Sequence, residues 1–397
     1  MSVIVVTYET PPGMLNLCLR SVLDSDYRPI ELVIVDNSQT SVVADEVSSW
    51  THRSPELGRK VVFLPQKRNS GYAAATNQGL AASSGELVLL LNPDAVLEHT
   101  ALAKLVDAAT RRPRAIGFAP KVTLDGHEGI LDSVGIDLFL RAEGAQRGLG
   151  EPDIGQFDLE ERVAGLCFAA ALVRSSAFSP RSIGPLDERF FMFYEDVDWS
   201  MRASLRGEEF WSVPSATVRH VHSASTRGMR SNFKDRLIQR NLIWTAAKNL
   251  ERCRVGPVVA RRTLLALGGG FLSGHPWTAL RLSGEAWMGM PGMLATRREY
   301  QKRRTHSDRA VLAKGKLRGS FDSSKYRPLP TVSTLISVLS RLYVTSPSPA
   351  LGVLVFRLTL AERTAGAYPG RMAQLVRESG VDIPSGLEWL LQRLEAD

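Results

Sequence analysis

The first half of the chain alternates short apolar runs with longer segments in which apolar residues recur every three or four positions. Four apolar runs have the length and composition of strands: residues 2–8, 30–38, 60–66 and 85–94. Helical patterns follow the first and the third run, at residues 12–25 and 71–83. Strands that alternate with helices are typical of a parallel sheet flanked by helices. The pattern therefore predicts the α/β class.

The middle of the chain breaks this alternation. Residues 111–158 are rich in glycine and irregular, as expected of a long excursion over a binding site. A helical pattern, "EDVDWSMRASLRG", comes next, and a strand pattern then ends in His220 and His222. The remainder is helical in pattern, and its last segment ends in the amphipathic sequence "SGLEWLLQRLEA". We predict three parts: residues 1–230 with the sheet and the site, a basic helical region at 231–320, and a helical segment of unknown role at 321–397.

Composition indicates a globular intracellular protein. With 397 residues, of which 44% are hydrophobic, the chain is long enough to bury a large core. Its three cysteines, Cys18, Cys167 and Cys253, lie far apart, which argues against a disulfide framework and a zinc site. The N-terminal sequence "SVIVVTYE" lacks the features of a secretory signal. We therefore expect the protein in the cytoplasm.

The charge of the chain is lopsided. A net charge of +8 and a pI near 9.5 would suit nucleic acid, an anionic membrane surface or a phosphorylated substrate. The basic residues crowd between Arg227 and Arg318, without the aromatic interleaving of a nucleic-acid platform. Attraction to anionic lipid explains the same charge. We expect no nucleic-acid partner, and a peripheral position on the cytoplasmic face of the plasma membrane.

One apolar stretch in the basic region, residues 263–280, contains no formally charged residue. A membrane span needs about 20 predominantly apolar residues, whereas this stretch contains four glycines, a proline and a histidine. The composition favours a helix pair that lies on a bilayer surface or packs on the main domain, and a true span is the alternative.

Polar side chains follow each of the four predicted strands. They are Thr7, Tyr8 and Glu9, then Asp36 and Asn37, then Asn69 and Gly71 in a loop, and finally Asn92 and Asp94. A single aspartate at a strand end is often a helix cap or a turn residue. Four polar strand ends in one sheet indicate a site, because ligands of open α/β sheets bind at the carboxyl edge.

The type of ligand follows from which motifs are present. Neither a G-x-G-x-x-G nor a Walker A sequence follows any strand, which argues against a dinucleotide oxidoreductase and a P-loop nucleotidase. The fourth strand instead ends in "LLLNPDA". Oxygen ligands at a strand end suit Mg²⁺ or Mn²⁺ held jointly by a carboxylate and substrate phosphates.

The ordered motifs "VVTYE", "VDNS", "NSGYAAATNQG", "LNPDA", "FFMFYEDVDW" and "VRHVHSAS" resemble family 2 glycosyltransferases of GT-A fold. The resemblance covers about residues 2–250 and is greatest to bacterial rhamnosyltransferases and cell-wall or O-antigen sugar transferases. It implies a Rossmann-like, mostly parallel sheet flanked by helices. It also implies a dTDP- or UDP-sugar donor, with dTDP-rhamnose as one candidate, and a glycan or lipid-linked acceptor in cell-envelope polysaccharide synthesis.

The resemblance assigns roles to the strand-end residues. It implies that the base and ribose are contacted by Thr7, Tyr8, Glu9 and Asp36, and that Asn69 and Gly71 line the nucleotide pocket. Asp94 matches the last carboxylate of the family's Asp-x-Asp metal motif. Asn92 stands where the first carboxylate is expected, which leaves one fewer charge on the metal. A histidine completes the metal site in similar sequences, and the register favours His220 over His222.

The acids Glu195, Asp196 and Asp198 follow a run of aromatic residues. The resemblance implies that Asp196 is the base that deprotonates the acceptor hydroxyl in an inverting transfer, with Glu195 as the alternative. Neighbouring like charges and apolar surroundings disfavour ionisation and so strengthen a base. The same acids would also suit the start of a helix, because a helix N-terminus attracts negative charge.

The segment "RLIQRNLIW" resembles the Arg-Asn helix start of the family, not the Gln-x-x-Arg-Trp of processive synthases. No multi-span membrane region follows it, so we expect transfer of a single sugar. The alternative is a catalytically silent GT-A domain that serves as a binding or scaffold module. Loss of Asp94 or Asp196 would have favoured that alternative, and both residues are present.

Overall fold

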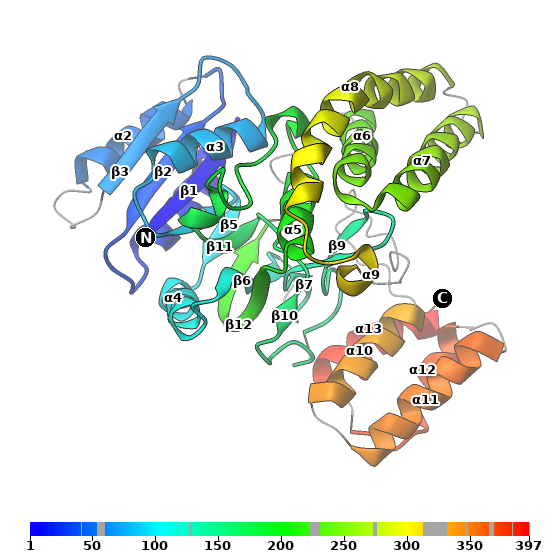
Figure 1. The fold of residues 1–397 in the computed structure, drawn as a ribbon. Coiled ribbons are helices and arrows are strands. Elements are labelled where there is room, and N and C mark those ends of the chain that lie inside the picture. The colour runs from blue at the N-terminus through cyan, green and yellow to red at the C-terminus, as the bar shows by residue number, and fades with distance from the viewer. Residues whose placement is uncertain are drawn as a thin grey trace.

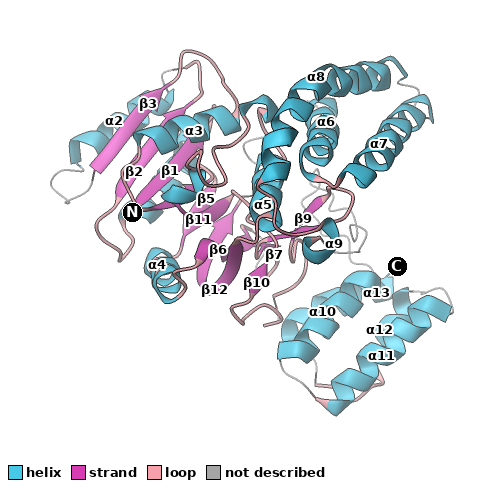
Figure 2. Cartoon of the chain, viewed as in Figure 1, coloured by secondary structure: helices cyan, strands magenta, loops and turns pink. Residues whose placement is uncertain are grey.

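The structure is a computed structural model in which a large sheet carries helices on both faces (Figure 1). It describes residues 1–40, 42–53, 60–126, 129–153, 155–221, 231–272, 276–312, 332–345, 348–364, 369–382 and 384–396. A group of helices, α6 to α8, lies beside the sheet, and a second group, α10 to α13, forms the C-terminal part (Figure 2).

The elements follow in chain order. The strands are β1 Ser2–Thr7, β2 Glu31–Asp36, β3 Lys60–Pro65, β4 Leu87–Leu91, β5 Ala95–Leu97, β6 Ala115–Leu124, β7 Leu131–Ser133, β8 Ile136–Leu138, β9 Gly144–Gln146, β10 Arg162–Val163, β11 Ala170–Arg174 and β12 Glu209–His220. The α-helices are α1 Pro12–Leu23, α2 Val42–Arg53, α3 Tyr72–Ala82, α4 Ala101–Arg111, α5 Glu195–Leu205, α6 Ser231–Asn249, α7 Arg252–Leu272, α8 Pro276–Lys302, α9 Asp308–Val311, α10 Val332–Thr345, α11 Pro349–Thr364, α12 Pro369–Arg377 and α13 Ser385–Ala396. Short 3₁₀ turns span Ser175–Phe178 and Glu188–Phe190.

The large sheet has the strand order β10-β12-β6-β11-β4-β1-β2-β3. Strands β4, β1, β2 and β3 run parallel, and so do β6 and β12, whereas β11 is antiparallel to both of its neighbours. The short strands β5 and β7 pair with β12 and β6. The parallel strands therefore end at one edge, which is where the polar strand ends meet.

Alternation along the buried strands explains the layers. Val3 and Val5 of β1 face the core that is shared with α1, α2 and α4. Ile4 and Val6 point to the opposite face and pack in the core that includes α3 and Trp199 of α5. A strand that is covered on both faces is apolar at every position, which is why these runs are continuous in the sequence.

The predicted α/β class, the four strands and the two helices predicted in the first hundred residues are confirmed, whereas α2 was not predicted. The expectation of an irregular excursion at 111–158 is wrong in part, because β6 occupies Ala115–Leu124 and lies inside the large sheet. Gly117 and Pro120 hide its strand character in the sequence. Gly117 has a packing reason, since a Cβ there would lie 2.5 Å from a side-chain carbon of Leu166.

The helices after residue 230 form two groups. Helices α6, α7 and α8 share a core with Phe190, which comes from the loop before α5. Helices α10 to α13 enclose a core of their own, and their Arg341 lies over the ring of Phe157 at 4.4 Å. The boundaries at 230 and 320 stay a prediction.

The apolar stretch at 263–280 is divided between α7 and α8. Within the described parts of the chain, no helix is long and apolar enough to cross a membrane.

Candidate active site

A cavity of about 360 Å³ opens at the carboxyl edge of the parallel strands. Nine of the side chains predicted from the sequence line it: Thr7, Tyr8, Asn69, Gly71, Asn92, Asp94, Glu195, Asp196 and His220. They come from strand ends, from the loop before α3, from the start of α5 and from the end of β12. The fold thus gathers residues that are more than two hundred positions apart.

Glu9 and Asp36 do not line this cavity. Glu9 is exposed, at φ 48°, and its backbone N–H donates to Ser38 Oγ at 2.7 Å. Asp36 is buried, and its Oδ1 accepts from the Ser38 N–H at 2.9 Å. Ser38 therefore links the loops that follow β1 and β2. Contact of either acid with a base or ribose stays a prediction.

Asp94 and His220 meet because β5 pairs antiparallel with β12. His220 lies opposite Ala95 in this pairing, and the Val221 N–H donates to the Asp94 carbonyl at 3.0 Å. The Nε2 of His220 lies 3.2 Å from Asp94 Oδ1. His222 lies outside the described residues.

Asp132 completes this cluster from the strand beside β6. Its Oδ2 lies 2.7 Å from His220 Nδ1, and both side chains are buried. Burial lowers the pKa of His220, but Asp94 and Asp132 outweigh burial and raise it to about 10. At neutral pH the imidazole therefore carries a proton on each nitrogen, with Nδ1 directed at Asp132 and Nε2 at Asp94. A metal ion bound at Nε2 would take the place of the proton on that nitrogen.

The donor set of this cluster fits a divalent ion. A carboxylate that orients one imidazole nitrogen while the other faces the ion is the usual outer support of a metal-bound histidine. Adjacent ligands of an octahedral ion at about 2.1 Å lie about 3 Å apart, close to the 3.2 Å between Asp94 Oδ1 and His220 Nε2. No complete group of three metal-ligating acids, histidines or cysteines occurs among the residues that the structure places. The remaining ligands would have to be substrate oxygens and water.

Glu195 and Asp196 begin helix α5 and also line the cavity. Asp196 is half-buried, and its Oδ1 accepts from the Val197 N–H at 2.7 Å. Burial raises the pKa of Asp196 to about 6, although backbone N–H groups lower it in part. Burial, and after it the charge of Asp196, raises the pKa of Glu195 well above its usual value.

The two carboxyl groups thus differ in what they can do at neutral pH. Glu195 Oε2 is buried and has no hydrogen-bond partner among the described residues, a position that an ionised oxygen would occupy only at high cost. Glu195 is therefore the neutral acid of the pair, and Asp196 is the ionised one. A carboxylate with a pKa near 6 is well suited to accept a proton near neutrality.

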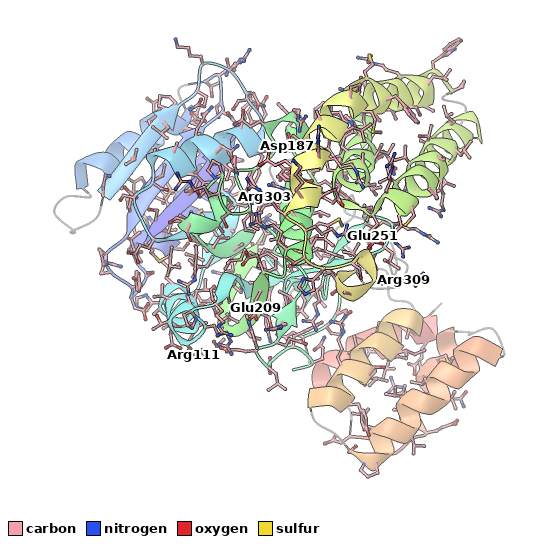
Figure 3. All side chains as sticks on the ribbon, viewed as in Figure 1. Arg111, Asp187, Glu209, Glu251, Arg303 and Arg309 are labelled. Carbon is pink, nitrogen blue, oxygen red and sulfur yellow. The ribbon has the colours of Figure 1, made fainter. Side chains whose placement is uncertain are left out.

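Asp198 has a structural role. It is fully buried and bonded to Arg202 at 3.1 Å, Lys248 at 2.9 Å and Asn249 at 2.8 Å. Lys248 also donates to Asp187 at 2.7 Å, and Figure 3 labels the position of Asp187. This cluster fastens α5 to α6, and removing one partner would leave an uncompensated buried charge.

The loop before α5 is strained. Phe191, Phe193 and Tyr194 all have positive φ, at 66°, 66° and 70°. Such conformations are costly for residues with a side chain and persist only where the surroundings enforce them. Gly71 is part of these surroundings, because it has φ +84° and a Cβ there would lie 2.5 Å from the Phe191 carbonyl oxygen.

Asn241 of α6 holds the same loop from the other side. It is fully buried, and its Nδ2 lies 3.0, 3.0 and 2.7 Å from the carbonyl oxygens of Phe190, Met192 and Phe193. Arg240 Nε donates to Asn241 Oδ1 at 3.0 Å, which turns the amide nitrogen toward the loop. Asn241 therefore fastens the loop that leads into Asp196.

We expect Asn241→Asp to lower kcat about 10- to 100-fold, by analogy with the range seen for groups that orient metal ligands. The aspartate keeps the size of the side chain but donates no hydrogen bond to the three carbonyl oxygens. Steady-state kinetics should show the loss in kcat with donor KM nearly unchanged.

The matched control for this variant is Gln239→Glu, a similar change on the same helix at a half-buried position. A loss in Asn241→Asp that appeared only in donor KM would contradict a positioning role.

Sequence reasoning missed Asp132, Asn241 and Lys234 as parts of the site. Lys234 of α6 also lines the cavity and is its one lysine or arginine within the described ranges. Burial lowers the pKa of Lys234. The only sequence signal for Asn241 is its place in "RLIQRN", and Asp132 lies in the glycine-rich segment 111–158, whose sequence has no regular pattern.

Comparison with known proteins is consistent with this geometry. Residues 2–179 match the model of the family described as Glycosyl transferase family 2. The chain is 31% identical over 248 residues to the N-acetylglucosaminyl-diphospho-decaprenol L-rhamnosyltransferase of Mycobacterium tuberculosis, an alignment that covers 57% of this chain and 77% of that protein. It is 26% identical over 276 residues to the low-salt glycan biosynthesis hexosyltransferase Agl10 of Haloferax volcanii, covering 64% and 78%.

Among solved structures, the chain resembles that of GalNAc-T7 with UDP, GalNAc and Mn²⁺, with a TM-score of 0.52 and 15% identity. The match covers 71% of this chain and 54% of the GalNAc-T7 chain, so this chain spans about half the length of that structure. This likeness shows the fold, and the predicted GT-A fold is confirmed.

Proposed function

The chain belongs to glycosyl transferase family 2, and from this membership we propose that it transfers one rhamnose, with inversion, from a nucleotide-sugar donor to a lipid-linked N-acetylglucosamine. That the protein is a glycosyltransferase follows from the family. The choice of sugar and acceptor is supported by the mycobacterial relative, whose name specifies both. A lipid-linked acceptor would place the transfer reaction at an anionic membrane surface, and the reaction would be a step in the synthesis of a cell-envelope glycan.

One observation carries the proposed chemistry. The Asp94–His220–Asp132 cluster and the Glu195–Asp196 pair line or support walls of a single cavity. A donor diphosphate at the first wall and an acceptor hydroxyl at the second would put the anomeric carbon between them. The apolar and aromatic lining from Phe168, Phe191 and Tyr194 would exclude water.

The chain's own residues would divide the reaction as follows. Asp196 takes the proton of the acceptor hydroxyl while the hydroxyl oxygen forms a bond to the anomeric carbon. The bond from that carbon to the diphosphate oxygen breaks, and its electron pair leaves with the diphosphate. Lys234, which lines the same cavity, would bind the departing charge. Glu195 stays protonated and adds no second negative charge beside Asp196.

Asp94 and His220 would hold Mg²⁺ or Mn²⁺ together with donor oxygens. Such an ion, when bound, neutralises charge on the leaving diphosphate. Asp132 orients the imidazole, and Asn92, whose Nδ2 lies 3.3 Å from His220 Nε2, lines the same wall. Asn69 and Gly71 line the cavity beside it and are proposed to bind the nucleotide, with Thr7 and Tyr8.

The proposal predicts which nucleotide sugar protects the fold against heat. We expect dTDP-rhamnose with Mn²⁺ to raise Tm more than UDP-, GDP- or ADP-sugars do, because a ligand that binds only the native state stabilises it. A panel of these donors, scanned with Mn²⁺ and with EDTA, measures this directly.

The same panel would identify a different donor if another sugar gave the largest shift. A chain that no nucleotide sugar stabilises, with or without metal, would contradict the proposed function.

A further inference from the structure

Helices α7 and α8 expose an unusual amount of apolar surface. Seven of the twelve exposed large hydrophobic residues in the described parts of the chain lie on these two helices. Trp277 is 82% exposed, Met288 76% and Leu264 68%. Isolated exposed hydrophobic residues are normal, but a contiguous group marks an interaction surface.

The exposed residues of α8 share one side of the helix. Trp277, Leu280, Trp287 and Met288 recur with helical spacing. The opposite side of α8 is buried against α6, where a Cβ at Gly289 would lie 2.3 Å from the Trp244 ring. The apolar stripe is therefore not the inward face of the helix.

The stripe continues onto α7. Trp287 Nε1 donates to Thr263 Oγ1 at 3.3 Å, and Leu264 and Leu265, which follow Thr263, are exposed. We call the six residues Leu264, Leu265, Trp277, Leu280, Trp287 and Met288 the hairpin face. Figure 1 shows α7 and α8 on the side of the molecule away from α2 and β3.

The charges around the hairpin face are positive. Arg261, Arg281 and Arg298 are exposed on α7 and α8. Helix α7 contains no acidic residue. The two acids of α8 are paired, Glu285 with Arg236 and Arg281, and Glu299 with Arg303. Tryptophan and apolar side chains mixed with arginine are typical of helices that lie in the headgroup region of a bilayer.

Many other arginines of this basic region are engaged within the protein. Arg297 donates to the Ala247 carbonyl at 2.8 Å, and Arg304 pairs with Asp308 at 2.6 Å. Arg262 is paired with Glu143. The basic stretch therefore offers fewer free cations than its sequence suggests. Arg261 and Arg281, which lie within three residues of Leu264 and Leu280 on the same helices, are exposed beside the hairpin face.

We propose that the hairpin face binds the surface of an anionic phospholipid bilayer. A second copy of the chain fits less well, because a symmetric dimer through this face would place Arg261, Arg281 and Arg298 of both copies in one interface. Anionic headgroups instead complement these arginines, while the apolar side chains enter the acyl boundary.

The reason for docking at a membrane rests on the proposed function, in which the acceptor is linked to a lipid. Helix α6 contributes Lys234 and Ile238 to the cavity and packs against α7 and α8. A bilayer bound at the hairpin face would therefore hold the cavity near the surface from which a lipid-linked acceptor projects.

The test is co-sedimentation of the full chain with vesicles. We expect binding to vesicles of phosphatidylcholine and phosphatidylglycerol, and much weaker binding to phosphatidylcholine alone. The variant Leu264→Ser/Met288→Ser should lose on the order of 100-fold in partitioning, since each buried apolar side chain contributes about tenfold. The control Leu17→Ser/Val353→Ser removes two side chains of similar exposure on α1 and α11 and should bind like wild type.

The outcomes separate this proposal from the proposed function. Transfer to a short, water-soluble acceptor should be unchanged in both double variants, and their melting curves should match wild type. Vesicle binding without any transfer would refute the function and support the docking face. Equal sedimentation of Leu264→Ser/Met288→Ser and wild type, or a wild-type dimer that this variant abolishes, would overturn the docking proposal.

Discussion

Asp196→Asn is expected to lower kcat by about 10²- to 10⁴-fold, the usual contribution of a positioned general base. The amide keeps an oxygen that can accept the Val197 N–H, which Asp196 Oδ1 accepts at 2.7 Å, so the start of α5 should persist. What is lost is the ability to take a proton. Steady-state kinetics should therefore show the loss in kcat with donor KM nearly unchanged, beside a melting curve close to that of wild type.

The matched control for this prediction is Glu195→Gln. Because Glu195 is the neutral acid of the pair, a glutamine reproduces its charge and shape, and turnover should stay near wild type. The raised pKa of Glu195 also makes the wild-type fold less stable as pH rises from about 4.5 toward the folded pKa. Glu195→Gln should thus melt higher than wild type at alkaline pH, and the gap should shrink on acidification. An inactive but folded Glu195→Gln beside an active Asp196→Asn would move the base to Glu195.

Asp94→Ala is expected to abolish metal-dependent donor binding and to reduce transfer by about 10³-fold or more. A Lewis acid at the leaving diphosphate is worth several kcal/mol, and about 1.4 kcal/mol corresponds to a factor of ten. The variant leaves His220 with one carboxylate, Asp132, on the nitrogen that faces away from Asp94. Calorimetric titration of the donor, with and without Mn²⁺, measures the loss.

Asp132→Asn provides the graded comparison. It leaves Asp94 and His220 in place and weakens only the orientation of the imidazole. We therefore expect the transfer rate to fall by about 10- to 100-fold. Excess EDTA should reduce wild-type transfer to the level of Asp94→Ala. Undiminished transfer in EDTA would contradict a metal at this cluster.

The sequence predicted the parallel part of the sheet and the edge where ligands gather, because both depend on local pattern. Each strand run near Thr7, Asp36 and Asp94 is short, apolar and followed by polar residues, and the strands end as that pattern requires. The direction of β11 could not be predicted in the same way. It depends on the pairing of residues that are about eighty positions apart, such as Ala170 with Leu91.

The site was predicted unevenly for the same reason. Asp94 and His220 are marked by their motifs, whereas Asp132 reaches the cluster only through the pairing of β7 with β6. Asn241 contacts a loop that is about fifty residues earlier in the chain. No local sequence pattern indicates that its amide nitrogen contacts three carbonyl oxygens of that loop. Glu9 and Asp36 follow strands as expected, but neither lines the cavity, and both are bonded to Ser38.

The most direct test of Asp196 as the base is the pH dependence of kcat/KM at saturating metal. Burial raises the pKa of Asp196 to about 6. Below that pH its carboxyl group is protonated and cannot accept a proton, and above that pH it is ionised. We predict a rate that rises with pH, is half-maximal near pH 6 and then levels off, in both wild type and Glu195→Gln, while the residual rate of Asp196→Asn lacks this acid limb. An acid limb that persists unchanged in Asp196→Asn, or that disappears in Glu195→Gln, would contradict the assignment.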